Sequence, residues 1–166
     1  MYRFITASFI FLFCIALFSA SACAGDQARL LAQNPDVKVK LTRDAVDESA
    51  GDVPCFKIET PAATYYLEKV GAGLSSMLDP DGVDWLGFNR QSGSGAGGEY
   101  RGFPNAVHQQ DGSFFHPKNS GTDPSTIEVV HEGPKRVTLI ATTNTETWQA
   151  RWDFYPTHCT FTMLQM

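Results

Sequence analysis

The stretch between residues 89 and 123 carries most of the side chains that could do chemistry. Its centre is Gly98–Asn105, with sequence GEYRGFPN, and His108 follows shortly after. Glycines let a backbone approach a ligand closely. The other residue types supply an acid, a phenol, a fixed cation, an amide and a titratable imidazole. Such a set of groups suits sugar hydroxyls and uronate carboxylates.

These residue types predict acid–base chemistry on a sugar, of the lyase or epimerase kind. Tyr100 or His108 would exchange a proton with a sugar carbon or ring oxygen, and Glu99 would orient the base. Five further side chains are expected to bind the substrate: Arg101, Asn105, His116, Arg90 and Arg151. Two plainer interpretations stay open. In the first, the loop is held by its own Glu99–Arg101 contacts; in the second, Arg151, which shares the polar face of its strand with Asp153, forms a cross-strand ion pair.

Other chemistries find little support in the sequence. His108 and His116 stand eight residues apart without further ligands at a defined spacing, so we predict no metal site. No G-x-S-x-G, P-loop or dinucleotide fingerprint occurs. The glycine-rich Ser92–Gly98 precedes no helical pattern. No cofactor is therefore expected.

A second hypothesis is a non-catalytic carbohydrate-binding module. Aromatic side chains would then stack on sugar rings, and the histidines would be incidental. The candidates are Tyr100, Phe103, Trp85 and Trp148. A third hypothesis is a structural envelope protein, and a fourth is the inactive product of a cut gene.

Apolar and polar residues alternate along most of the chain after residue 36, which predicts β-strands. About nine short strands separated by turn signals favour an all-β fold, an antiparallel β-sandwich. The strongest predicted hairpin joins 135–143 to 146–154, and on its second arm Trp148, Ala150, Trp152 and Phe154 share one face. The acidic stretch 44–54 is predicted to be a loop. The other expected strands are 37–41, 55–60, 64–69, 74–78, 126–131 and 158–164, and an apolar segment 83–86 follows the turn at 79–82.

The first 24 residues are typical of a cleavable signal peptide. Arg3 precedes an apolar run at 9–18 and a small-residue stretch at 19–24, and the run is too short to span a membrane. We expect a flexible leader at 25–36, a domain at 37–166, and a secreted or periplasmic location. The alternative is a lipid anchor at Cys23, which would give an outer-membrane or surface lipoprotein.

Charge and cysteine content restrict the partners and the cross-links. The net charge is −5 and no basic run occurs, so nucleic acid is not an expected partner. Cys55 and Cys159 form either a disulfide or two buried free thiols, and their apolar alternating segments favour the thiols. The chain ends at Met166 directly after an apolar strand, which predicts a domain that is incomplete at its C-terminus: either the N-terminal part of a larger protein or a truncated gene product.

Several motifs together resemble a group of secreted bacterial proteins, typical of Planctomycetes and Bacteroidetes that degrade complex polysaccharides. The motifs are Tyr65–Lys69, Gly71–Gly73, Asp84–Phe88, Gly98–Asn105, Phe115–Pro117 and Arg151–Asp153. The group is similar to galactose-mutarotase-like β-supersandwiches. The resemblance implies that fold and an association with polysaccharide degradation, and it carries over no catalytic residue.

Overall fold

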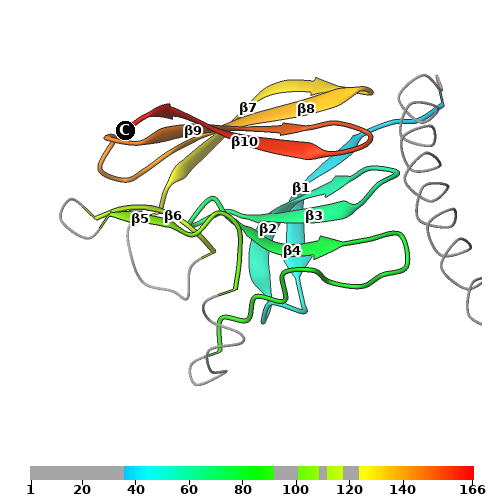
Figure 1. Cartoon of the computed structure of the whole chain (residues 1–166), viewed down its shortest axis with the longest axis horizontal. Helices are drawn as coiled ribbons and strands as arrows, with labels where there is room; N and C mark the ends of the chain where they lie inside the picture. The colour runs from blue at the N-terminus through cyan, green and yellow to red at the C-terminus, as the bar shows by residue number, and fades with distance from the viewer. Residues whose placement is uncertain (1–35, 92–100, 109–111, 118–123) are drawn as a thin grey trace, which may run out of the picture. The chain divides into compact units, whose positions relative to one another are not determined.

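The computed structural model describes residues 36–91, 101–108, 112–117 and 124–166. The expected signal peptide, the leader, Cys23 and the stretch 92–100 lie outside these residues. Figure 1 shows two layers of strands, one from the first half of the described chain and one from the second.

The first sheet is an antiparallel meander with the order β1-β2-β3-β4. Its strands are β1 (Lys40–Asp47), β2 (Val53–Glu59), β3 (Thr64–Glu68) and β4 (Leu74–Leu78). The predicted hairpin between 55–60 and 64–69 is present as β2 and β3. In contrast to the predicted loop at 44–54, β1 continues to Asp47 through an irregularity between Thr42 and Ala45. Charged side chains suit this strand because it lies at the sheet edge.

The second sheet is also an antiparallel meander, with the order β10-β9-β8-β7. Its strands are β7 (Thr126–Gly133), β8 (Arg136–Thr142), β9 (Gln149–Phe154) and β10 (Cys159–Gln165). The hairpin predicted from alternation is β8–β9, with Leu139 paired to Trp152. The buried Ala150, Trp152 and Phe154 share one face of β9, as predicted.

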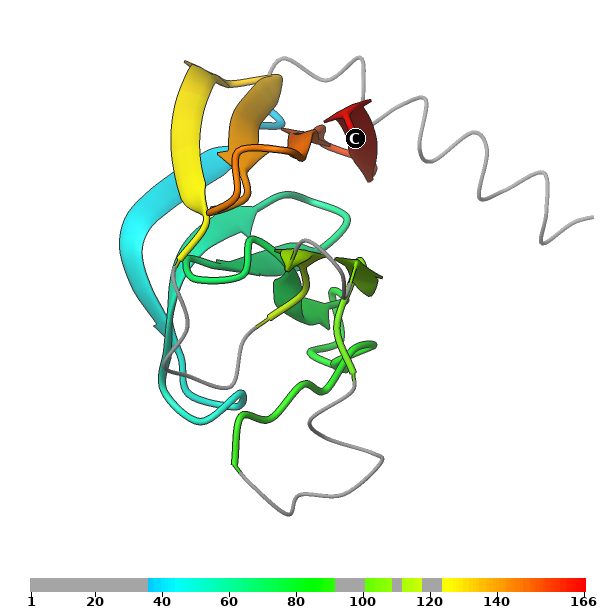
Figure 2. The same cartoon turned by 90° about the vertical axis from the view of Figure 1, so that its left-hand side faces the viewer.

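The two sheets pack face to face over one apolar core. Phe56, Ile58 and Leu67 of the first sheet share this core with Leu139 and Trp152 of the second. At one side β1 curves towards the second layer (Figure 2), and the Val39 amide donates to the Pro134 carbonyl over 2.9 Å. The described chain is therefore an antiparallel β-sandwich without helix, which confirms the predicted fold class at this level.

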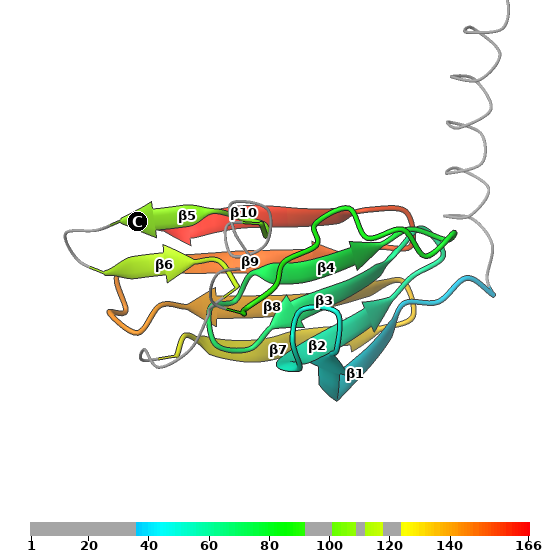
Figure 3. The same cartoon turned by 90° about the horizontal axis from the view of Figure 1, so that it is seen from below.

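A short hairpin of β5 (Ala106–His108) and β6 (Ser113–Phe115) lies in the layer of the first sheet and covers part of the second (Figure 3). Phe115 is fully buried against Ala141 and Ala150. The sequence around this hairpin shows no alternation that would have predicted it. The hairpin places the segment after Gly98–Asn105 directly on the sandwich.

Irregular chain covers the outer edge of β4. The Trp85 amide donates a hydrogen bond to the Met77 carbonyl over 3.0 Å, and the Phe88 amide donates to the Ser75 carbonyl over 3.2 Å. Leu74 and Phe103 exchange two backbone hydrogen bonds. The apolar segment 83–86 forms only an isolated bridge, Leu78 to Asp84, instead of a strand. This segment positions the exposed aromatic side chain described below.

Candidate functional site

The structure places the predicted site residues in several different environments. Glu99 and Tyr100 lie outside the described residues, and for His108 only the backbone, in β5, is described. Arg90, Arg101 and Asn105 are exposed, and His116 is buried. The predicted gathering of acid, phenol and imidazole in one hollow therefore stays a prediction.

Three of the sequence motifs meet beside the β3–β4 turn. The Gly71 carbonyl accepts the His116 amide over 3.1 Å. A Cβ added at Gly73 would lie 2.5 Å from Pro117 Cδ, and one at Gly102 would lie 2.7 Å from the same atom. Only glycine allows backbones to approach this closely. The motifs Gly71–Gly73 and Phe115–Pro117 and the described part of the third motif, residues 101–105, are therefore joined by packing.

The His116 ring lies inside this junction. Its Nδ1 lies 2.7 Å from the Pro117 carbonyl oxygen, and since a carbonyl can only accept, Nδ1 carries the proton. The ring meets Phe88 and Phe114 edge-on, each at 5.8 Å between centroids. Trp152 Nε1 donates to the Ala72 carbonyl over 3.1 Å at the same turn. These contacts give His116 a structural role, and its predicted role in binding stays untested.

Arg151 pairs with Asp153 on the outer face of β9. Its Nε lies 2.7 Å from Asp153 Oδ2, while Thr138 Oγ1 of β8 donates to Asp153 Oδ1 over 2.7 Å. The Asp153 carboxylate is almost completely buried. An ion pair is therefore present at Arg151, but it joins two residues of one strand, whereas the sequence interpretation had expected a pair across two strands.

A buried carboxylate, not predicted from the sequence, lies on the outer side of the first sheet. Asp47 Oδ2 accepts hydrogen bonds from the hydroxyls of Ser75 and Ser76, both at 2.6 Å. Its Oδ1 accepts from Ser49 Oγ at 2.6 Å and from the Ala50 amide at 3.3 Å. Asp47 thereby ties the end of β1 to β4, which stands at the opposite end of the sheet order.

Cys55 and Cys159 are free thiols in the described part of the chain. The pKa of the Cys55 thiol is raised to about 12, mainly by burial. The hydrogen bond with Ser75 lowers this pKa, and the nearby Asp47 and Glu68 carboxylates raise it. Burial likewise raises the pKa of Cys159 to about 11. Cys55 and Cys159 pack against different apolar clusters; both are free, as the favoured interpretation had it, but only Cys55 is fully buried, and Cys159 is half-buried.

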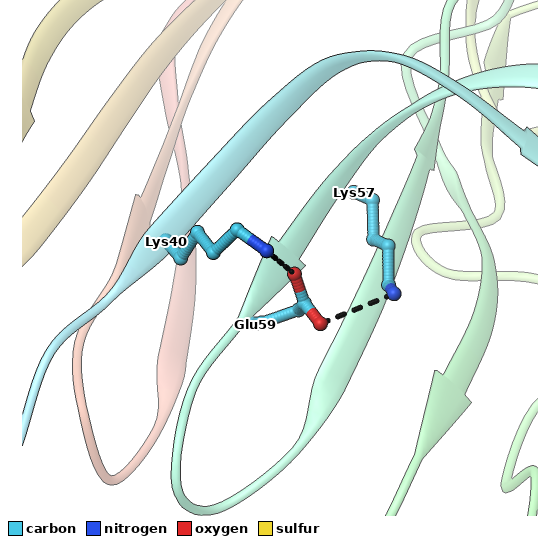
Figure 4. A network of polar contacts seen from close by, with 3 residues as sticks. All are labelled: Lys40, Lys57 and Glu59. Atoms are coloured by element: carbon cyan, nitrogen blue, oxygen red, sulfur yellow. Dashed lines mark ion pairs between the residues drawn. The ribbon is translucent and has the colours of Figure 1, made fainter.

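Two lysines flank one glutamate on the same sheet face (Figure 4). Lys40 Nζ lies 3.1 Å from Glu59 Oε2, and Lys57 Nζ lies 3.1 Å from Oε1. The hydrogen bond from Lys40 is the main cause that lowers the pKa of Glu59 below its usual value, with a further contribution from Lys57. Lys57 also lies 6.0 Å from the centroid of the Tyr66 ring.

Trp85 is the most exposed aromatic side chain of the described residues, at 67%. Its indole Nε1 donates to Asp79 Oδ2 over 2.9 Å. Asp79 Oδ1 accepts the amides of Asp81 and Val83, and Asp84 Oδ1 accepts the amide of Met77. The bond from Trp85 is also the main cause that lowers the pKa of Asp79. A flat aromatic ring is thus held in a fixed orientation on the surface.

The other aromatic candidates differ from Trp85. Phe103 is 46% exposed but meets Trp152 edge-on at 5.9 Å, and Trp148 is half-buried against Phe115. Tyr100 lies outside the described residues. The role of Asp79 was not predicted, although its turn, Asp79–Gly82, carries a clear sequence signal.

Among the described residues, no group of three or more His, Cys, Asp and Glu side chains is arranged to hold a metal ion. In the same part of the chain, no helix has the length and apolar character needed to cross a membrane.

Comparison with known proteins gives no match: no family model, no curated protein and no solved structure is significantly similar to this chain.

Proposed function

We propose that this chain is an exported carbohydrate-binding β-sandwich protein that contacts its ligand through Trp85. The observation that carries the proposal is the exposed indole, 67% accessible and fixed by Asp79. Export itself is proposed from the predicted signal peptide at residues 1–24.

The geometry suits a sugar ring for two reasons. The C–H face of a pyranose is flat and weakly polar, so it packs well on an aromatic face and removes apolar surface from water. The bond from Nε1 to Asp79 orients the indole before any ligand arrives, which lowers the entropy cost of binding.

The lyase or epimerase chemistry is a further proposal that rests on the sequence alone. Two of its three catalytic candidates, Glu99 and Tyr100, lie outside the described residues, and the side chain of the third, His108, is not described. Binding through Trp85 requires none of them.

Substitution of Trp85 by alanine tests the proposal. A Trp side chain offers at most about 250 Å². At 67% exposure, stacking on one face buries about 80 Å², worth about 2 kcal/mol at ~25 cal/mol per Å², or about 30-fold in Kd. The purified protein is screened on a glycan array, and the best ligand is titrated by calorimetry against wild type and Trp85→Ala.

Trp85→Phe is the matched control, because it keeps an aromatic face without the N–H donor and should retain part of the affinity. Circular dichroism spectra should match across the three proteins, since Trp85 packs outside the core. If no glycan binds, or if the best ligand binds Trp85→Ala as tightly as wild type, the proposal is wrong.

A further inference from the structure

We propose that the Trp85 turn selects sugars by charge, binding amino sugars that carry an ammonium group in preference to neutral sugars, and neutral sugars in preference to uronates. This inference rests on the proposed function and names its ligand class. It differs from the uronate expected from the arginine-bearing loop.

The charge around Trp85 carries the argument. The segment from Asp79 to Trp85 contains three carboxylates, from Asp79, Asp81 and Asp84, and no Lys or Arg. Asp79 Oδ2 lies 2.9 Å from the indole nitrogen, so one negative charge touches the ring edge. A ligand stacked on this ring therefore lies next to a carboxylate.

Hydrogen bonds fix two of these carboxylates. Asp79 Oδ1 accepts two backbone amides, and Asp84 Oδ1 accepts the amides of Met77 and Leu86, each at 3.0 Å. Asp81 is exposed at the corner of the turn, and it is the backbone nitrogen of Asp81 that donates to Asp79. The Asp81 carboxylate is therefore the easiest of the three to neutralise without changing the turn.

Among the described residues, the cation of Arg101 lies close to the segment. A Cβ added at Gly87, two residues beyond Trp85, would lie 3.5 Å from a guanidinium nitrogen of Arg101. The charge in direct contact with the ring is the negative charge of Asp79. The lysines on the sheet face, Lys40 and Lys57, are already paired with Glu59.

Two physical effects favour a cationic ligand at this ring. The face of an indole attracts an ammonium group through its quadrupole. The Asp79 carboxylate, 2.9 Å from the indole nitrogen, attracts the same group and repels a uronate, even with the dielectric screening of a surface. Together they predict that the amino sugar binds roughly tenfold more tightly than the neutral sugar. The uronate should bind roughly tenfold more weakly than the neutral sugar.

Three oligosaccharides of equal length test the order: a β-1,4-glucosamine trimer, cellotriose and a galacturonic acid trimer. Each is titrated by calorimetry at low salt and again at about 0.5 M NaCl, where screening should reduce the preference. Asp81→Asn should reduce the preference for the glucosamine trimer about threefold. Glu128→Gln removes the same charge from an exposed position on β7 and should leave the preference unchanged.

The outcomes separate the two proposals. The predicted order, reduced by Asp81→Asn and by salt, supports the inference. If cellotriose or the uronate trimer binds as tightly as the glucosamine trimer, and Trp85→Ala loses that binding, charge selection is wrong while carbohydrate binding stands. If none of the three binds and the array is also negative, both proposals are wrong.

Discussion

Substitution of Gly73 by alanine should destabilise the protein, because this residue lies where the β3–β4 turn meets the segment at residues 116–117. An added Cβ would lie 2.5 Å from Pro117 Cδ, 2.7 Å from Pro117 N and 2.8 Å from His116 C. Two of these are backbone atoms, and the His116 amide is bonded to the Gly71 carbonyl. Moving the two segments apart to admit the Cβ would lengthen that hydrogen bond.

The expected cost lies in the upper part of the range for overpacking, about 3 kcal/mol. For a domain of this size that corresponds to a fall in Tm of about 10 °C. Urea unfolding followed by fluorescence gives the free energy of unfolding, and a thermal melt gives Tm. The slope of the urea transition should stay unchanged if the native state keeps its buried surface.

Gly82→Ala is the matched control. Gly82 has a φ of +82°, and no described atom lies within 4 Å of its added Cβ. The substitution should lower the free energy of unfolding by roughly 1 kcal/mol, because alanine disfavours the left-handed backbone conformation at this position. If Gly73→Ala costs no more than Gly82→Ala, the segment at 116–117 does not pack on this turn, and the junction of the three motifs is wrong.

Three further predictions concern the polar groups of the first sheet and the thiols. Asp47→Ala should lower the free energy of unfolding by about 3 kcal/mol, because it leaves buried hydroxyls without their acceptor; a urea titration that gives less than about 1 kcal/mol would contradict this. Lys40→Gln should raise the pKa of Glu59 towards 4.5, measured by NMR titration of its carboxyl carbon. Because the lowered pKa stabilises the fold above pH ~4.5 and this stabilisation is lost on acidification, the variant should lose less stability between about pH 5 and pH 3 than wild type. Cys55 and Cys159, with pKa values near 12 and 11, should resist alkylation at about pH 8 until the protein is denatured, and peptide mass spectrometry should show no disulfide between them.

Alternation predicted most of the sandwich because side chains of a half-buried strand point alternately to core and surface. It was insufficient for β1, where Arg43, Asp44 and Asp47 give the local sequence the composition of a loop. All three charges find partners far along the chain: Arg43 pairs with Glu132, Asp44 pairs with Lys69, and Asp47 accepts the serines of β4. Such long-range partners leave no periodic signal in the local sequence.

The candidate site was predictable only in its parts. Trp85 was a candidate for stacking, and the residues at 79–82 indicated a turn. Their connection through the indole–carboxylate bond depends on the three-dimensional path of the turn. Asp153 shows the opposite case: alternation places it on a polar face, yet Thr138 and Arg151 enclose it, and it is buried.

The hydrogen bonds that hold Trp85 all come from within its own short stretch of chain, from Met77, Asp79 and their neighbours. The orientation of the indole therefore depends mainly on this stretch. A designer could graft it onto the edge of an unrelated antiparallel sheet. Substitutions at its exposed residues, such as Trp85 and Asp81, could likewise change its specificity over evolution, whereas Met77 and Leu86 are constrained because they pack against the core.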